Sequence, residues 1–264
     1  NGCPTQQTVT MIEPSTSVVS SYTQSNFNNF GVSCNGDNDG WIDLTVNGGI
    51  GIHTYSWSNG ETTEDINTIG AGTYSVTATD ENGCSTPQTV IITEPSALTS
   101  STTQSNFNSF GVSCHGDNDG WIDLTVNGGV DNIAYTYSWS NGETTEDINT
   151  IGVGTYSVIT IDANGCSTQD TVIVTEADSI TSSFTTTDWN NYEIQCNGGS
   201  NGEITLAVLG GVTALPYSFD IDGSSNPTNI FNNISAGTYT LTATDANGCP
   251  TQQTVTMIEP STSV

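Results

Sequence analysis

Internal repetition is the feature that most constrains the fold of this chain. Residues 1–18 and 247–264 are identical letter for letter, at an offset of 246 residues. Three similar segments, the first and third of which overlap these copies, each contain a C-x-G motif, a GG pair, a GTY and an NGC. Self-similarity at a fixed period is the signature of tandem repeat architectures. The sequence therefore predicts an array of small domains built for length.

The repeats also predict the domain boundaries. We expect the end of a preceding repeat at 1–14, repeats at 15–95, 96–177 and 178–260, and the start of a further repeat at 261–264. The chain begins inside a motif and without Met, so we expect it to be a segment of a longer array. From each NGC cysteine to the next C-x-G cysteine there are 31, 30 and 30 residues. Flexible linkers have no physical reason to keep their length, so we expect short, ordered linkers.

Apolar and polar residues alternate with period two in every repeat. In GWIDLTVN, Ile42 and Leu44 face one side and Trp41 and Asp43 the other. Clusters of Gly and Asn separate such runs and favour hairpin turns. Short strands at this spacing predict an all-β fold of tandem antiparallel β-sandwiches, with about seven strands each.

The alternation also predicts the core of each sandwich. In the first repeat the expected core residues are Ile42, Leu44, Val46, Tyr55, Trp57, Ile66, Ile69, Tyr74, Val76, Ala78, Val90 and Ile92. In the third repeat they are Ile204, Leu206, Val208, Phe219, Tyr239, Val255 and Met257, with Phe219 in the position of Trp57. Trp139 is the expected core Trp of the second repeat.

The charge balance excludes several classes of partner. The chain has no Lys or Arg and 28 Asp or Glu residues, which gives a net charge of −28. Nucleic acids and anionic membranes are excluded because both require basic side chains to neutralise phosphate. No apolar run approaches the ~20 residues of a membrane span, so we expect no membrane insertion. In a salty medium, screening within ~10 Å makes such a charge tolerable.

The repeated motifs resemble a known family. The string SCNGDNDGWIDLTVNGG, followed by YSWSNGETTEDI and GAGTYSVTATDENGCSTPQTVIITEP, resembles the SprB repeat in each of the three segments. SprB repeats occur in large surface adhesins of gliding Bacteroidota that are secreted by the type IX system. The resemblance implies an immunoglobulin-like fold, an adhesive or motility role at the cell surface, and no catalytic residues. The third segment departs most, with Glu203 in place of the outward Trp.

The seven cysteines allow two disulfide frameworks. Pairing between repeats would give Cys3–Cys34, Cys84–Cys114 and Cys166–Cys196; pairing within repeats would give Cys34–Cys84, Cys114–Cys166 and Cys196–Cys249 and leave Cys3 to a partner beyond this stretch of chain. We count four strand crossings between Cys34 and Cys84, which would return the chain to the end that it left. A disulfide requires Cα atoms within about 7 Å, so this count favours pairing within each repeat. Disulfides are also expected in a secreted β-domain.

An acidic turn makes calcium a candidate cofactor. Alternate oxygen-bearing side chains followed by Gly resemble the front of a calcium loop. The candidate ligands are Asn35, Asp37, Asp39 and Asp43 in the first repeat, and Asp117, Asp119 and Asp123, preceded by His115, in the second. We expect Asp80 at the same end. The third repeat has Asn197, Gly199, Asn201 and Thr205 instead, so a simple turn is the alternative interpretation.

Two further kinds of candidate site follow from exposed residues. Trp41 and Trp121 are expected to face outward, where they could be covered by a neighbouring strand or repeat, or could contact a sugar or another filament. Asp170-Thr171-Val172 and Asp178-Ser179-Ile180 resemble the Bacteroidota O-glycosylation pattern, which makes Thr171 and Ser179 candidate acceptors. His53 and His115 occupy unrelated places, and the sequence contains no Ser–His–Asp set, zinc spacing or phosphate loop.

Together these features predict an extracellular, non-enzymatic tandem-repeat protein that forms a cell-surface or secreted filament or an adhesin stalk. The expected partners are neighbouring repeats, other copies of the filament and surface polysaccharide. The alternative is an array of carbohydrate-binding modules that use the outward Trp residues.

Overall fold

A computed structural model describes residues 4, 6–12, 16–130, 134–213 and 216–261. These residues contain 19 β-strands and no helix. The first repeat has β1 (Val19–Gln24), β2 (Gly40–Asn47), β3 (Thr54–Trp57), β4 (Ile66–Ile69), β5 (Gly72–Thr79) and β6 (Ser85–Ile92). The second has β7 (Ser96–Gln104), β8 (Gly120–Gly129), β9 (Thr136–Trp139), β10 (Ile148–Ile151), β11 (Gly154–Ile161) and β12 (Ser167–Val174). The third has β13 (Thr181–Thr186), β14 (Gly202–Leu209), β15 (Ser218–Ile221), β16 (Ser224–Asn226), β17 (Ile230–Ile234), β18 (Gly237–Thr244) and β19 (Pro250–Met257).

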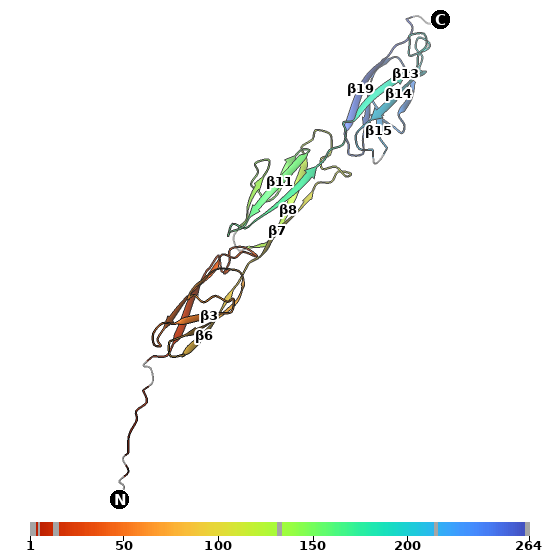
Figure 1. Ribbon diagram of the computed structural model, residues 1–264. Helices are drawn as coiled ribbons and strands as arrows, with labels where there is room; N and C mark the ends of the chain where they lie inside the picture. Colours follow the sequence, from red (N-terminus) through yellow and green to blue (C-terminus); the bar gives the residue numbers. More distant parts are fainter. Residues whose placement is uncertain (1–3, 5, 13–15, 131–133, 214–215, 262–264) are drawn as a thin grey trace. The chain divides into compact units, whose positions relative to one another are not determined.

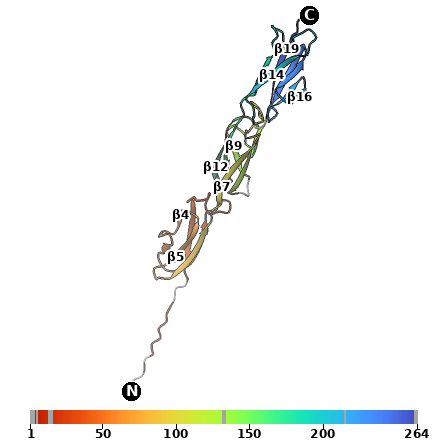
Figure 2. The same cartoon turned by 90° about the vertical axis from the view of Figure 1, so that its right-hand side faces the viewer.

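Each repeat contains two sheets, as Figure 1 and, after a turn of 90°, Figure 2 show. The strand orders are β1-β2-β4 and β3-β5-β6 in the first repeat, β7-β8-β10 and β9-β11-β12 in the second, and β13-β14-β17 and β16-β15-β18-β19 in the third. Strand pairing in the first and third repeats is antiparallel. The predicted all-β fold of tandem immunoglobulin-like sandwiches is confirmed, with six, six and seven strands among the described residues.

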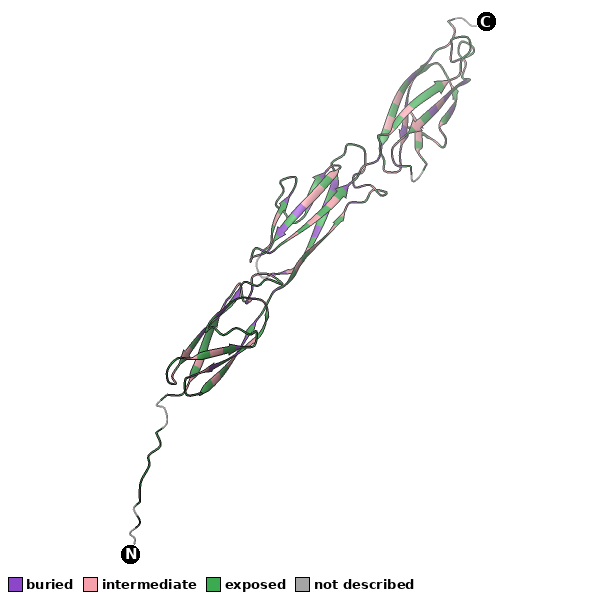
Figure 3. Cartoon of the chain, viewed as in Figure 1, coloured by how far each residue is buried: buried purple, intermediate pink, exposed green. Residues whose placement is uncertain are grey.

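The core of the first repeat follows the period-two pattern. Along β2, buried Ile42 and Leu44 alternate with exposed Trp41 and Asp43, and the same alternation is seen along the strands in Figure 3. Trp57 is buried, and its indole Nε1 donates a hydrogen bond to the carbonyl of Thr63 at 2.9 Å. The predicted core residues of this repeat are buried or half-buried, which confirms the prediction.

The third repeat has its own core, with one correction to the predicted positions. The seven predicted core residues are buried or half-buried and pack in one cluster. However, Phe219 pairs with Ala243 as Tyr55 pairs with Ala78, whereas Ile221 pairs with Leu241. The prediction that Phe219 takes the position of Trp57 was therefore wrong. The sequence alone did not fix the register, because the loop before β15 differs in length.

Contacts divide the chain into two compact units. The first comprises Asn1–Ser100, Val126–Thr136 and Ile159–Thr168, and the second comprises Ser101–Thr125, Tyr137–Val158 and Gln169–Val264. The junction of the first and second repeats therefore lies inside the first unit, and the junction of the second and third repeats lies inside the second unit. The domain boundaries expected from the repeats stay a prediction.

Strand directions determine where the two cysteines of a repeat lie. β4 is antiparallel to β2, and β3 is antiparallel to β5. The ends of β2 and β5 meet, since the backbone N–H of Ile50 donates to Asp80 at 3.0 Å. β2 and β5 therefore run in the same direction. β3 and β4 both run in the opposite direction, each in a different sheet, and together they count as one return crossing. Three crossings, rather than the expected four, separate the cysteines and place them at opposite ends.

Candidate functional site

The two ends of each repeat carry corresponding sets of residues in the three copies. We name the loop D-x-N-G-C the NGC end; its residues are Asp80, Asn82 and Cys84, then Asp162, Asn164 and Cys166, then Asp245, Asn247 and Cys249. We name the opposite end the CxG end; its residues are Phe27, Asn28, Ser33 and Cys34, then Phe107, Asn108, Ser113 and Cys114, then Trp189, Asn190, Gln195 and Cys196.

A nearly buried aspartate organises the NGC end. Asp80 Oδ1 accepts hydrogen bonds from the backbone N–H groups of Asn82 and Cys84 at 2.9 and 2.8 Å. Burial raises the pKa of Asp80, but hydrogen bonds from the backbone N–H groups of Cys84, Ile50 and Asn82 outweigh it and lower the pKa. Gly49 has a φ of +71°, and a Cβ there would lie 2.8 Å from the Asp80 carboxylate. The GG motif therefore lets the backbone approach this aspartate.

The CxG end is built by backbone turns and a glutamate. Phe27 and Phe30 exchange backbone hydrogen bonds at 2.7 and 3.0 Å, with Asn28 and Asn29 at positive φ between them. After the cysteine, the N–H of Gly36 donates to the carboxylate of Glu94, in the EP motif, at 2.7 Å. The turn is therefore tied to the chain that leaves the same repeat.

The NGC end of one repeat binds the CxG end of the preceding repeat. At the first junction, Asn164 Nδ2 donates to the carbonyls of Ser33 and Phe27 at 2.8 and 3.3 Å, and Asn28 Nδ2 donates to Asn164 Oδ1 at 2.7 Å. The amide of Asn164 thus uses both its donor and its acceptor groups across the junction.

The second junction repeats these contacts in its own unit. Asn247 Nδ2 donates to the carbonyls of Ser113 and Phe107 at 2.8 and 3.2 Å. Asn108 Nδ2 donates to Asn247 Oδ1 at 2.5 Å. The same Asn-mediated junction therefore occurs twice, with corresponding residues.

Disulfides join the same ends covalently. Cys34 pairs with Cys166, and Cys114 pairs with Cys249, with Cα–Cα distances of 5.6 and 5.7 Å. The predicted pairs Cys34–Cys84, Cys114–Cys166 and Cys196–Cys249 were therefore wrong, because the cysteines of one repeat lie at opposite ends. Cys84 and Cys196 carry free thiols. Cys3, expected to pair beyond this stretch, lies outside the described residues.

The candidate calcium ligands take part in the CxG turn. Ser33 donates its backbone N–H to Asp39 and its hydroxyl to Asp37, at 3.0 and 2.9 Å. Burial raises the pKa of Asp39, but the hydrogen bonds from the side chain and backbone of Ser33 outweigh it and lower the pKa. Ser113 makes the same two hydrogen bonds to Asp119 and Asp117. In the third repeat Asn201 accepts the corresponding hydrogen bond at 3.2 Å, so the turn does not need a charge.

The remaining candidate ligands are dispersed. Asn35 donates to the carbonyl of Pro95 at 3.1 Å, and Asp43 and Asp123 are exposed on β2 and β8. Asp80 lies at the NGC end, so its expected place beside the acidic turn was wrong. Among the described residues, no three or more His, Cys, Asp or Glu side chains form a group that could hold a metal ion. Calcium binding stays a prediction.

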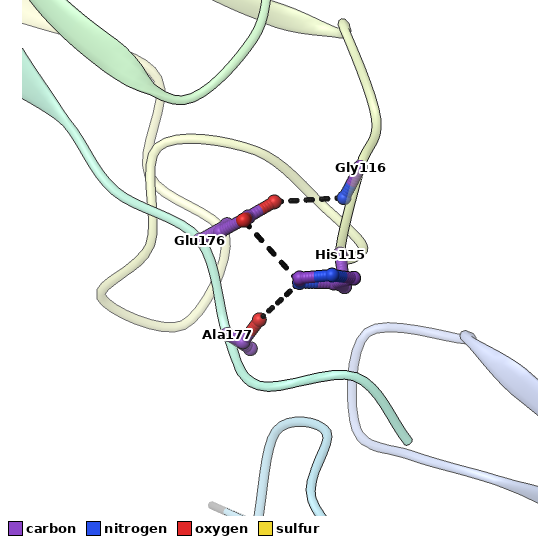
Figure 4. Close-up of polar contacts among 4 residues, drawn as sticks. All are labelled: His115, Gly116, Glu176 and Ala177. Carbon is purple, nitrogen blue, oxygen red and sulfur yellow. Dashed lines mark hydrogen bonds and ion pairs between the residues drawn. The ribbon is translucent and has the colours of Figure 1, made fainter. Parts of the chain in front are cut away.

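His115 takes the structural position of Asn35 in the second repeat. Its Nδ1 lies 3.2 Å from the carbonyl of Ala177 and 3.3 Å from Glu176 Oε1, while Gly116 donates to Glu176 Oε2 at 2.7 Å (Figure 4). All of these contacts tie the CxG turn to the chain leaving the repeat. The contacts of His115 at the CxG end are therefore structural.

The outward Trp residues are exposed, as expected. Trp41 and Trp121 expose 38% and 40% of their surface. Trp41 lines a shallow depression with Asp43, Asp65 and Asn67. The candidate glycosylation residues Thr171 and Ser179 are also exposed, Thr171 on β12 and Ser179 after it. Their modification stays a prediction.

Sequence reasoning missed the function of the asparagines. Asn82, Asn164 and Asn247 occupy the same position in the NGC motifs of the three repeats, but we interpreted the motif only as a hairpin turn. The sequence did contain a signal for this function. A hairpin turn favours Asn-Gly, but the turn by itself does not require Cys directly after Asn-Gly in all three repeats. Asn28, Asn108 and Asn190 recur in the same way.

Comparisons with known proteins agree with the repeat assignment. The SprB repeat model matches residues 31–62, 109–144 and 193–226. The resemblance stated from the sequence is thus confirmed in three segments of the chain. No curated protein matches the chain. No helix of the described residues is long and apolar enough to cross a membrane.

Several solved structures are similar at low identity. A Ca²⁺-stabilized adhesin with which an Antarctic bacterium binds ice is 15% identical, with 94% of this chain and 74% of that chain covered and a TM-score of 0.41. Extracellular cadherin domains 1–4 of protocadherin gamma B7 are 13% identical, with 92% of this chain and 71% of that chain covered and a TM-score of 0.34. Extracellular domains 3–5 of Drosophila OTK are 11% identical, with 79% of this chain and 86% of that chain covered and a TM-score of 0.30. Similarity at this level carries no argument about function.

Proposed function

We propose that this SprB-repeat chain is part of an extracellular, non-catalytic structural or adhesive protein that forms a cell-surface filament or adhesin stalk. The observation that carries the proposal is the junction, in which a disulfide and Asn hydrogen bonds join one repeat to the next. A chain cross-linked at each junction is suited to bearing tension. The high negative charge, without a basic residue, fits an exposed surface in a salty medium.

The disulfides limit how far the chain can be stretched. The shortest covalent path from residue 1 to residue 264 runs to Cys34, crosses to Cys166, returns to Cys114, crosses to Cys249 and continues to the end. This path contains about 100 residues, so at ~3.5 Å per residue its full length is about 350 Å. Without disulfides the same chain would extend to roughly 920 Å.

Single-molecule force spectroscopy on the chain held at its ends tests this function. We expect the oxidised protein to reach its limiting extension near the shorter length, and the reduced protein to reach the longer one. Equal extensions with and without reductant would contradict a load-bearing role of the junctions. Antibody labelling of intact cells, viewed by electron microscopy, should place the repeats on surface filaments; label found only after permeabilisation would contradict the location.

Carbohydrate binding is the second candidate function. The depression lined by Trp41, Asp43, Asp65 and Asn67 combines an aromatic face with hydrogen-bonding groups, which is the chemistry of a sugar site. A polysaccharide array tests it: binding should be lost in the double variant Trp41→Ala, Trp121→Ala and kept in Ile91→Ala, which removes another exposed apolar side chain. Absence of binding by the unaltered chain would remove this candidate.

A further inference from the structure

The outer face of the sheet β1-β2-β4 places an exposed indole among carboxylates. Trp41 is 38% exposed and lines a shallow depression with Asp43, Asp65 and Asn67. Trp is the aromatic side chain that attracts a cation most strongly through its ring face. The two carboxylates attract a positive charge as well, so the indole and the acids of this depression favour the same kind of ligand.

The backbone holds this depression in a fixed geometry. The N–H of Trp41 donates to Ser25 Oγ at 3.0 Å, and the N–H of Ser25 donates to the carbonyl of Trp41 at 3.0 Å. On its other side Trp41 pairs with Asn67 of β4, next to a register shift. Asp65 Oδ1 accepts the N–H of Leu44 at 2.9 Å. The side chains of the depression are therefore attached to paired strands or tied to them.

The second repeat builds the same arrangement. Trp121 is 40% exposed, and its N–H donates to Ser105 Oγ at 3.1 Å. It pairs with Asn149 of β10, again next to a register shift. Asp147 Oδ1 accepts the N–H of Leu124 at 2.9 Å. An exposed indole with a fixed carboxylate beside it therefore occurs in both repeats.

The third repeat keeps the frame and loses the chemistry. Glu203, Thr205 and Ile230 occupy the positions of the Trp and of the two Asp residues. The N–H of Leu206 donates to the backbone carbonyl of Asn229 at 2.9 Å, in place of a carboxylate. Strand pairing and the register shift persist without the indole and the two acids, so the frame does not require them.

Charge decides which ligand suits this surface. The chain has no Lys or Arg, so no basic side chain neutralises the carboxylates, and an anionic polysaccharide would be repelled. A neutral sugar can stack on the indole but leaves the carboxylates uncompensated. An amino sugar with a free amine provides an apolar ring face for the indole and an ammonium group for the acids.

We propose that the depression at Trp41 and the corresponding surface at Trp121 bind a cationic polysaccharide that contains amino sugars with free, protonated amines. A sugar ring packs on the indole, and its ammonium group donates hydrogen bonds to the neighbouring carboxylates. This inference rests on the carbohydrate-binding candidate above and specifies its ligand class. It places a site in the first and second repeats and none in the third.

Three β-1,4-linked hexasaccharides test the ligand class, because they differ only in the C2 substituent: hydroxyl, acetamide or ammonium. Isothermal titration calorimetry of the chain, at mildly acidic pH and constant ionic strength, should show two sites for the ammonium form, with at least about tenfold tighter binding than for the other two. Equal affinity for the acetamide or hydroxyl form would overturn this inference and leave carbohydrate binding in place. Absence of binding by all three would overturn both.

Matched variants separate a built site from diffuse attraction to an acidic chain. Trp121→Ala should leave one site per chain. In that background Asp65→Asn, which keeps an Oδ1 acceptor for Leu44 but removes the charge, should weaken binding of the ammonium form about threefold or more. Glu61→Gln, which removes one exposed carboxylate from the loop after β3, should keep the affinity. Equal losses in these two variants, or two sites remaining in Trp121→Ala, would overturn the proposal.

Discussion

At the residue scale, the junction depends on amide and carboxylate groups that satisfy backbone polar atoms. Asp80 and its counterparts order the NGC loop, and Asn164 and Asn247 connect that loop to the carbonyls of the preceding repeat. Each amide donates to two carbonyls and accepts from a second Asn. A polar group that is buried at the junction without a hydrogen-bond partner costs free energy. Each of these side chains therefore favours the one arrangement of the two repeats that satisfies it.

Replacement of Asn164 by Ala should weaken only the first junction. We expect the Cys34–Cys166 disulfide to be reduced about five- to tenfold faster by dithiothreitol, because the hydrogen bonds to Ser33 and Phe27 are lost. Cys114–Cys249 in the same molecule is the internal control and should keep its rate. Timed alkylation and mass spectrometry measure both rates. Equal acceleration of both disulfides would contradict a local role for Asn164.

Asp80 should make stability depend on pH. Its pKa is lower in the folded state than its usual value of about 3.9 in an unfolded chain. Its stabilising effect is therefore fully present above about pH 4 and is lost as pH falls through the folded pKa. Denaturant unfolding between pH 7 and pH 2.5 should show a smaller acid-induced loss in Asp80→Asn than in the unaltered chain. Asp43→Asn, on the exposed face of β2, is the control for the loss of one carboxylate.

At the element scale, the same sequence forms a strand in one place and none in another. Residues 250–257 form β19, which pairs with β18 and buries Val255 and Met257. The identical letters at 4–11 form no strand where they are described, and Val9 and Met11 are 78% and 89% exposed. Strand formation here therefore requires the partner strand as well as the local pattern.

This pair of segments provides a matched mutational test. Met257→Ala should lower the free energy of unfolding of the third repeat by about 2–5 kcal/mol, the usual cost of truncating a buried side chain. Met11→Ala, in identical local sequence, should leave stability unchanged. Denaturant unfolding of the full chain measures both. A comparable loss in Met11→Ala would show that the N-terminal segment is packed in solution.

At the scale of the whole molecule, the covalent connections follow the order of the repeats. Cys34 and Cys166 are 132 residues apart, and Cys114 and Cys249 are 135 apart, so each disulfide links one repeat to the next. Peptide mapping without reduction should recover these two pairs. Because the chain has no Lys or Arg, the map requires a protease specific for acidic residues. Recovery of Cys34–Cys84 would contradict the strand directions as well as the pairing.

Calcium is expected to act on the first two repeats. Asp37, Asp39 and Asp43 concentrate like charges in one segment, as do Asp117, Asp119 and Asp123, whereas Asn197–Thr205 do not. Binding that adds about 1 kcal/mol should raise Tm by about 4–8 °C in calcium relative to EDTA. Sodium chloride of matched ionic strength is the control for screening. If sodium chloride stabilises the first two repeats as much as calcium does, the acidic segment is only a turn.

The sequence by itself determined the repeat, the antiparallel sandwich and the core, because strand alternation is a local property with period two. Ile42, Leu44 and Trp57 are buried for this reason, and Trp41 is exposed for the same reason. Only the tertiary structure decided that β3 and β4 share one crossing, and therefore which cysteines meet. That outcome depends on which sheet each short strand joins, and no local pattern encodes it. The Asn contacts also depend on the neighbouring repeat, so they become visible only when two repeats are placed end to end.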